Sequence, residues 1–323
     1  MIGPTALCPE GIELLLLDLD GTVMIDGTVI HDRVADAVLQ ARERGCMVCI
    51  STGRAYNMVP PAMRGPESVD YIICANGSRI YDTFEGVLYE RLMTREQILE
   101  AMDALKPLHA GWNAFVGDHS YFEWRGVSYM VTGRREPLGA GDVVKSLHAD
   151  AGLSLARKAV VASRKAVRFA SRLVMGREGM SQVMSVRPYI EKATEGICKV
   201  GCSLPTEELC DRAMVILDHL GHFEVARMSR TELEITARGV TKGVAATWLM
   251  DYLGVDKART VAFGDSENDA TLIDVSGTFV AMGNADGRIK KRADDICEPN
   301  YDDGVARWLE RAMSEADGAS YVQ

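Results

Sequence analysis

Blocks of apolar and polar residues alternate at both ends of this chain. The apolar run Leu14–Leu17 has the pattern of a strand buried on both faces of a parallel sheet, and it predicts a strand over residues 13–19. Apolar residues then recur at helical spacing over residues 32–44, and Gly45 ends that helix. The pattern continues with a strand at 47–51, a short helix at 55–63 and a strand at 71–74. Such alternation predicts parallel strands joined by right-handed crossovers.

The middle of the chain has a mixed pattern instead. It predicts a hairpin at 79–81 and 86–89, a helix at 94–108, strands at 112–116 and 120–124, helical patterns from 142 to 190, a strand at 198–204, a helix at 206–220, and strands at 224–228 and 232–236. This mixture is typical of an α+β unit.

Alternation returns after Thr241, with helices at 242–253, 268–275, 287–293 and 304–313 and strands at 260–263 and 278–282. We therefore expect an α/β fold: a Rossmann-like parallel-sheet core with helices on both faces, formed by residues 1–83 and 237–323. Residues 84–236 are expected to form a separate α+β domain inserted into it, since insertions are tolerated where the host chain makes an exposed loop.

Bulk composition narrows the class of protein. The 323 residues are 47% hydrophobic and 25% charged, as in a globular protein with room for two domains. The net charge of -10 argues against a general nucleic-acid binder. No apolar stretch approaches the ~20 residues that span a bilayer, so no membrane partner is expected. The first residues lack a basic region followed by an apolar core, so we expect no signal peptide and a cytoplasmic location.

Asp18 and Asp20 lie two residues apart, directly after the first predicted strand. The carboxyl end of a strand is where open α/β sheets place their chemistry. Gly21 follows and breaks the regularity of the strand, which frees the second aspartate to move independently of the first. One carboxylate can then attack a substrate while the other transfers protons. The alternative is an ordinary Asp-Gly turn.

Three further polar segments follow core strands or open the helix that re-enters the core. The segment 51–54 offers the Thr52 hydroxyl and turn amides, which suit either a phosphate oxygen or a helix cap. Lys242 stands at a helix N-terminus, where a lysine opposes the helix dipole and indicates a further purpose, although most lysines are simply solvated. The segment 264–269 has three acids and an amide, which suit Mg²⁺ or cap a helix. Together the four clusters suit phosphoryl transfer, because an anionic nucleophile needs cations to approach an anionic phosphate.

The motifs, in this order, resemble a known family. DxDGT at 18–22, TGR at 52–54, Asn76-Gly77, TKG at 241–243 and GDSEND at 264–269 resemble the haloacid dehalogenase-like phosphatases. Within that family the chain is similar to the Cof-type subgroup, which has a large α/β cap inserted after the third core strand. Segments 281–285, 293–294 and 302–306 also follow the ending of that subgroup. The cap residues give no match beyond the type of cap.

The resemblance implies a role for each matching residue. Asp18 would be the nucleophile that forms an aspartyl-phosphate, and Asp20 would protonate the leaving oxygen and then activate water. The implied metal ligands are Asp18, Asp20 (through its backbone carbonyl), Asp265 and Asp269, the phosphate-binding residues are Thr52, Gly53, Lys242 and Asn268, and Asn76, Arg54 and Asn284 are further candidates near the site.

The implied activity is Mg²⁺-dependent hydrolysis of a small phosphorylated metabolite, with a sugar phosphate first and a phosphorylated cofactor next. The protein would act as a monomer or homodimer. A phosphotransferase or phosphosugar mutase on the same fold is one alternative. A non-catalytic binding or regulatory protein is another, although competent residues fill every catalytic position.

A basic block stands out in this acidic chain. Residues 151–190 contain eight Lys or Arg, from Arg157 to Arg187, and a single acid, Glu178. Such a run is usually a solvated helix face. Alternatively, it attracts a substrate with more than one phosphate, or an acidic partner.

Overall fold

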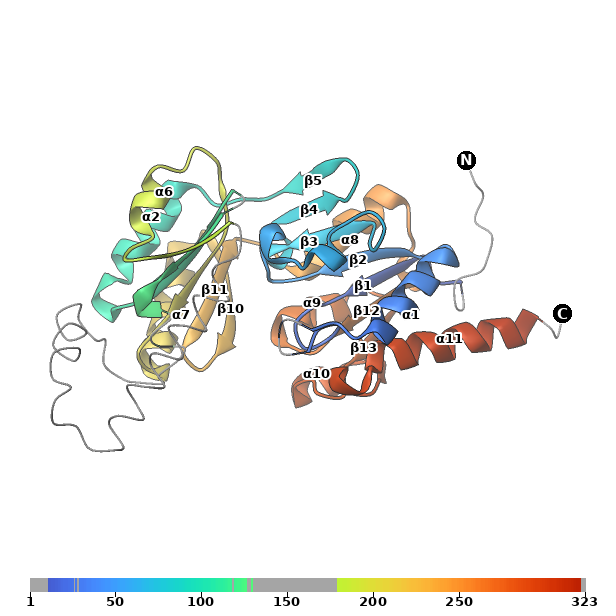
Figure 1. The fold of residues 1–323 in the computed structure, drawn as a ribbon. Helices are drawn as coiled ribbons and strands as arrows, with labels where there is room; N and C mark the ends of the chain where they lie inside the picture. Colours follow the sequence, from blue (N-terminus) through green and yellow to red (C-terminus); the bar gives the residue numbers. More distant parts are fainter. Residues whose placement is uncertain are drawn as a thin grey trace, which may run out of the picture. The chain divides into compact units, whose positions relative to one another are not determined.

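The chain folds as two units, each built around its own sheet (Figure 1). This computed structural model describes residues 11–25, 27, 29–117, 119–126, 129 and 179–320. The first unit takes the chain up to Arg91 and again from Gly239, and the second takes Leu92–Arg238. The α/β fold with an inserted second sheet is therefore confirmed.

Eight strands form the sheet of the first unit, in the order β14-β13-β12-β1-β2-β3-β4-β5. The strand β1 lies in the middle, with Leu15 beside Val261 of β12 and Val48 of β2. From β14 to β3 every pairing is parallel, and β4 and β5 complete the sheet antiparallel. The bounds are β1 Leu14–Leu17, β2 Met47–Ser51, β3 Tyr71–Cys74, β4 Arg79–Asp82, β5 Gly86–Glu90, β12 Thr260–Gly264, β13 Thr278–Ala281 and β14 Asp295–Ile296.

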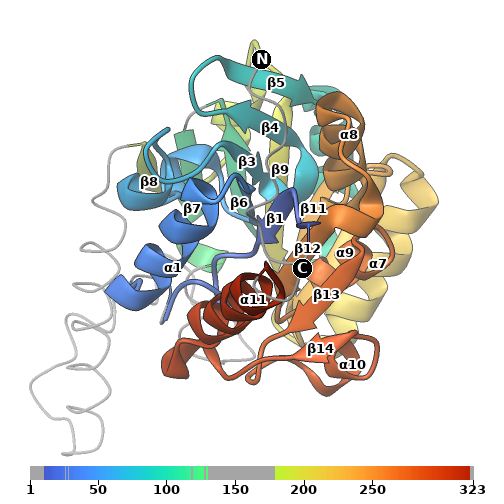
Figure 2. The same ribbon diagram turned by 90° about the vertical axis from the view of Figure 1, so that its right-hand side faces the viewer.

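Helices cover both faces of this sheet. Figure 2 shows α1 and α11 on one face and α8 and α9 on the other. The helices of this unit are α1 Asp32–Glu43, α8 Lys242–Leu253, α9 Ala270–Ile273, α10 Gly287–Lys290 and α11 Gly304–Ser320. The four leucines of β1 are at most 1% exposed, as expected for a strand buried on both sides.

The second unit has a six-stranded sheet in the order β10-β11-β9-β6-β7-β8. Alternate residues of its strands, among them Trp112, Val200 and Ile235, pack with Ile98 and Leu217 of two helices in a separate hydrophobic core. The elements are α2 Arg95–Ala104, β6 Gly111–Val116, β7 His119–Glu123, β8 Met180–Val183, α6 Arg187–Glu191, β9 Ile197–Ser203, α7 Glu207–Leu220, β10 Phe223–Ser229 and β11 Glu232–Ala237.

Several of the predicted helices differ from the structure. The helix predicted at 94–108 ends at Ala104, and the one predicted at 287–293 ends at Lys290. The helix expected at 55–63 is two short 3₁₀ turns, Tyr56–Met58 and Pro61–Met63, because Pro60 and Pro61 lack the N–H groups that a helix needs. The helix expected at 268–275 is a 3₁₀ turn, Glu267–Asp269, followed by the short α9. Most of the helical pattern predicted at 142–190 lies outside the described residues, and the prediction is wrong for Met180–Val183, which pair with β7.

The predicted boundary at residue 84 falls inside a hairpin. Strand β5 pairs with β4 in the sheet of the first unit, so the chain leaves that unit after Arg91. The assignment of catalysis to one unit and specificity to the other stays a prediction.

The basic block lies mostly outside the described residues. Its described member Arg187 pairs with Asp103 at 2.7 Å and Glu191 at 3.0 Å on the surface, as in a solvated helix face. Among the helices that the structure describes, none is both long and apolar enough to cross a membrane.

Candidate active site

A buried lysine joins two aspartates from distant parts of the chain. The Lys242 ammonium donates to Asp18 Oδ1 at 2.6 Å and to Asp269 Oδ1 at 2.7 Å. All three side chains are at most 5% exposed. Burial acts to lower the pKa of Lys242, but the two carboxylates outweigh it and hold this pKa above its ordinary value. The lysine therefore stays charged and fixes both aspartates.

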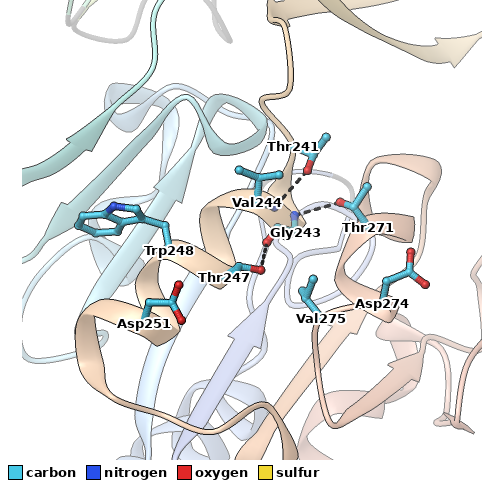
Figure 3. Close-up of a pocket in the computed structure, with 9 residues that line it drawn as sticks. All are labelled: Thr241, Gly243, Val244, Thr247, Trp248, Asp251, Thr271, Asp274 and Val275. Atoms are coloured by element: carbon cyan, nitrogen blue, oxygen red, sulfur yellow. Dashed lines mark hydrogen bonds between the residues drawn. The ribbon is translucent and has the colours of Figure 1, made fainter.

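Lys242 is the first residue of α8, and Figure 3 shows its two chain neighbours, Thr241 and Gly243, at this helix start. Thr241 caps the helix, since its hydroxyl accepts a hydrogen bond from Val244 N at 3.1 Å. Gly243 N donates to Thr271 Oγ1 at 3.0 Å, which ties this helix start to α9. The surface hollow in Figure 3, of about 440 Å³, is lined by neighbours of Lys242 on α8 and by α9, and Lys242 itself is not part of its lining.

Asp265 lies at the carboxyl end of β12 and approaches the loop that follows β1. A Cβ on Gly21 would lie 2.3 Å from Asp265 Oδ2, and Gly21 has a φ of +84°, so both space and backbone require glycine there. Burial raises the pKa of Asp265 to about 7, and the neighbouring Asp269 carboxylate adds to the effect. Its Oδ1 is buried and accepts no hydrogen bond within the described part of the chain.

Asp18, Asp265 and Asp269 form an acidic cluster that fits a metal ion. One oxygen from each lies within 4.8 Å of the others. In the described part of the chain, the Lys242 ammonium contacts Asp18 and Asp269 but not Asp265. Burial raises the pKa of Asp18 well above its ordinary value, against the opposing effect of Lys242. A divalent cation would relieve this excess of negative charge and satisfy the orphaned Asp265 oxygen. The donors are hard carboxylate oxygens, as Mg²⁺ prefers.

Asp269 is held more firmly than the other two aspartates. Its Oδ1 accepts from Lys242, and its Oδ2 accepts from the backbone N–H groups of Asp265 at 3.0 Å and Ser266 at 3.1 Å. These bonds shape the loop that carries Asp265, so Asp269 positions Asp265 as well as contributing charge.

Asp20 lies apart from this cluster. Its side chain is 49% exposed, and both oxygens pair with the Arg54 guanidinium, at 2.6 and 2.7 Å. Two aspartates separated by one residue thus have different environments, one buried against a lysine and the other half exposed against an arginine.

Hydrogen bonds connect the remaining predicted residues. Arg54 N donates to Thr52 Oγ1 at 3.1 Å across Gly53, and Asn76 N donates to Thr52 O at 3.1 Å. Asn268 donates from Nδ2 to Asn76 Oδ1 at 3.2 Å and accepts from Ser266 Oγ at 2.7 Å. Asn76 has a φ of +59°, which asparagine tolerates better than most residues. The bonds form a continuous chain from Asp20 to the loop that holds Asp269.

Asn284 supports the backbone around the site. Its Nδ2 donates to Gly21 O at 2.8 Å, and its Oδ1 accepts from Asn300 N at 2.9 Å. The sequence did not single out Gly27, whose carbonyl accepts from Arg54 at 2.7 Å. The Asp-Gly pair at 26–27 was the signal that could have pointed to this turn.

Comparison with known proteins places the chain among enzymes. A model of the haloacid dehalogenase-like hydrolase family matches residues 15–309. A 5-amino-6-(5-phospho-D-ribitylamino)uracil phosphatase of Bacillus subtilis is 24% identical over 298 residues, 92% of this chain and 94% of that protein. A pyridoxal phosphate phosphatase of Escherichia coli is 23% identical over 298 residues, 92% of this chain and 97% of that protein.

Solved structures share the fold. A haloacid dehalogenase-like hydrolase from B. subtilis superposes with a TM-score of 0.73 at 23% identity, covering 93% of this chain and 99% of that one. A sugar phosphatase of subclass IIB gives a TM-score of 0.69 at 19% identity, covering 93% of this chain and 98% of that one.

Proposed function

This chain belongs to the haloacid dehalogenase-like hydrolases and is a phosphatase of their Cof-type subgroup, and we propose that it hydrolyses a small phosphomonoester with Mg²⁺ through a phosphorylated Asp18. The observation that carries the proposal is the Lys242 bridge between Asp18 and Asp269, beside Asp265. Buried carboxylates around one fixed ammonium suit an anionic nucleophile that must meet an anionic phosphate.

Asp18 is the proposed nucleophile. Lys242 holds its Oδ1, which leaves Oδ2 to attack phosphorus. The new bond joins Asp18 to phosphorus as the bond from phosphorus to the leaving oxygen breaks. Asp20 enters this step as the neutral acid and gives that oxygen its proton, which leaves Asp20 as a carboxylate. In the second step a water oxygen attacks phosphorus, Asp20 takes its proton, and the bond from phosphorus to Asp18 breaks. Phosphate leaves and both aspartates return to their starting states.

The metal would be held by the Asp18 and Asp265 carboxylates and the Asp20 backbone carbonyl, with Asp269 beside them. When bound, Mg²⁺ supplies positive charge that offsets the charge of the carboxylates and the phosphoryl group. Thr52, Gly53, Lys242 and Asn268 are the proposed phosphate-binding residues.

The substrate class is proposed from the relatives. Those that match along most of this chain are named for a ribitylamino-uracil phosphate and for pyridoxal phosphate, and a sugar phosphatase shares the fold. A sugar phosphate is our first candidate, and a phosphorylated cofactor or cofactor precursor is our second. Residues 92–238 are the proposed source of the contacts that select among them.

The first experiment measures phosphate release from a panel of sugar phosphates, pyridoxal phosphate and the ribitylamino-uracil phosphate, with Mg²⁺ and with EDTA. We expect Mg²⁺-dependent release that the isosteric Asp18→Asn variant lacks. Asp274→Asn is the matched control, since Asp274 is an exposed carboxylate paired with Arg292. Release that persists undiminished in Asp18→Asn would contradict the proposed nucleophile. Phosphate transfer to an added sugar would favour the phosphotransferase or mutase, and inactivity towards the whole panel would favour the binding protein.

A further inference from the structure

The Asp20 side chain is held by two rigid donors. Arg54 Nε donates to Oδ2 at 2.7 Å and Arg54 Nη2 donates to Oδ1 at 2.6 Å, a bidentate pair that fixes the plane of the carboxylate. Without such a partner, a half-exposed aspartate on a loop would sample several rotamers.

Arg54 is itself held on three sides. Its Nη2 donates to Gly27 O at 2.7 Å, its Nη1 donates to Met58 O at 3.0 Å, and its backbone N donates to Thr52 Oγ1 at 3.1 Å. The Arg54 side chain is only 13% exposed. The Arg54 backbone is therefore tied to Thr52, and its guanidinium links Asp20 to the backbone carbonyls of Gly27 and Met58.

Gly27 lies against the ion pair between Arg54 and Asp20. It has a φ of +67°, and a Cβ there would lie 3.3 Å from both Arg54 Nη2 and Asp20 Oδ1. A side chain at this position would be strained by the backbone and would crowd the ion pair.

We propose that Arg54, which donates to Gly27 O, is the positioning residue for Asp20 and keeps its carboxyl group in one orientation, both as the acid that gives a proton and as the carboxylate that takes one. This inference rests on the proposed function, in which Asp20 first gives a proton to the leaving oxygen and later takes one from water. Displacing a reacting group by about 1 Å costs a rate on the order of 100-fold. An ion pair that only stabilised the fold would affect all steps alike.

The test separates the two proton transfers by the choice of substrate. An alkyl phosphate needs a proton on its leaving oxygen, whereas p-nitrophenyl phosphate releases a phenolate that leaves without one. In Arg54→Met, we expect single-turnover phosphorylation of Asp18 by the best alkyl phosphate of the panel to fall on the order of 100-fold. Phosphorylation by p-nitrophenyl phosphate should change by less than about threefold. Hydrolysis of the aspartyl-phosphate still needs Asp20, so p-nitrophenol should appear as a stoichiometric burst followed by slow turnover.

Three further variants test whether the loss of rate arises from the positioning of Asp20 by Arg54. Arg54→Lys keeps the positive charge but loses the planar pair of N–H donors, so it should recover only part of the rate of Asp18 phosphorylation by the alkyl phosphate. Arg64→Met removes a nearby arginine whose described contacts are with Tyr56, and should match the wild type. In an Asp20→Asn background, Arg54→Met should cost less than about threefold, because the group that it positions is already disabled.

The possible results distinguish failure of the positioning role from failure of the proposed function. Equal losses with both substrates and no burst, or the same loss in the Asp20→Asn background, would overturn the positioning role while leaving the phosphatase proposal intact. A wild type that releases phosphate from neither substrate would overturn the proposed function and this inference with it.

Discussion

The effect of each residue at this site on stability depends on the charged groups that it contacts. Lys242 is the only cation in contact with the buried oxygens of Asp18 and Asp269 in the described structure, and it is fully buried itself. Removing one partner of a buried ion pair leaves the other charges uncompensated, which costs much more than losing a surface pair. The same lysine therefore serves both stability and the proposed phosphoryl binding.

Replacing this lysine should destabilise the metal-free protein strongly. We expect Lys242→Met to lower the free energy of unfolding of the first unit by about 3–5 kcal/mol, because two buried carboxylates then face each other without an ammonium. Urea denaturation followed by tryptophan fluorescence measures the loss.

Lys291→Met, at an exposed lysine, is the control and should change the free energy by less than about 0.5 kcal/mol. Adding Asp18→Asn to Lys242→Met should recover part of the stability. A Lys242→Met protein that unfolds at the same urea concentration as the wild type would rule out this account of the lysine.

Among the secondary-structure elements, the short strand β14 at the edge of the first sheet leads directly into a buried cysteine. Strand β14 has two residues, and Cys297 directly follows it, 4% exposed and with its Sγ 3.5 Å from Met282 Sδ. Burial raises the pKa of Cys297 to about 12, and the neighbouring Glu298 adds to the shift. Only the thiolate reacts with alkylating agents, so this thiol should be inert while the edge of the sheet is intact.

Alkylation of Cys297 should depend on pH in a distinctive way. A pKa of about 12 leaves far less thiolate at pH 8 than the ordinary pKa of about 8.5 does, so reaction with iodoacetamide should be about 1,000-fold slower than in urea. The native rate should keep rising with pH beyond 9, where an exposed thiol has already levelled off.

Mass spectrometry of the peptide that contains Cys297 measures this rate, with the urea-unfolded protein as the control. Labelling in the native state at the rate of a small-molecule thiol would show that the β14 edge opens readily.

The whole molecule is two units with separate hydrophobic cores, one on each sheet. A unit with its own core has the means to unfold as its own cooperative step. The acidic cluster lies entirely in the first unit, so metal binding is expected to stabilise that unit and not the other.

Mg²⁺ should therefore shift one unfolding transition and leave the other in place. At 100 times its Kd it should stabilise the first unit by about 2.7 kcal/mol, and EDTA should reverse the shift. Two single-tryptophan variants report the units separately, one retaining Trp308, which packs on Phe263, and one retaining Trp112 in the second core.

Asp265→Asn is the matched control and should lose most of the Mg²⁺ shift. Equal shifts of both transitions would argue against metal binding confined to the first unit.

Many elements could be predicted because their signals are local. Strands β2 and β3 and helix α8 have the predicted bounds, since each is an apolar run or a capped helix readable within a dozen residues. The helix predicted at 55–63 is wrong for a local reason, since two adjacent prolines, Pro60 and Pro61, interrupt the helical hydrogen bonds. The strand at Met180–Val183 was missed because its pairing with β7, far earlier in the chain, outweighs its weak local pattern.

The family, the α/β class and the motif residues can be read from the sequence, because paired acids, a hydroxyl, a lysine and an acidic loop are chemical types that recur at fixed spacings. Which of these side chains contact one another depends on the folded structure. Lys242 and Asp18 are 224 residues apart, and Arg54 and Asp20 are 34 apart, so no local pattern reports either pair. Sequence spacing constrains neighbours along one element, whereas these contacts depend on how parallel strands bring their carboxyl ends to one edge of a sheet.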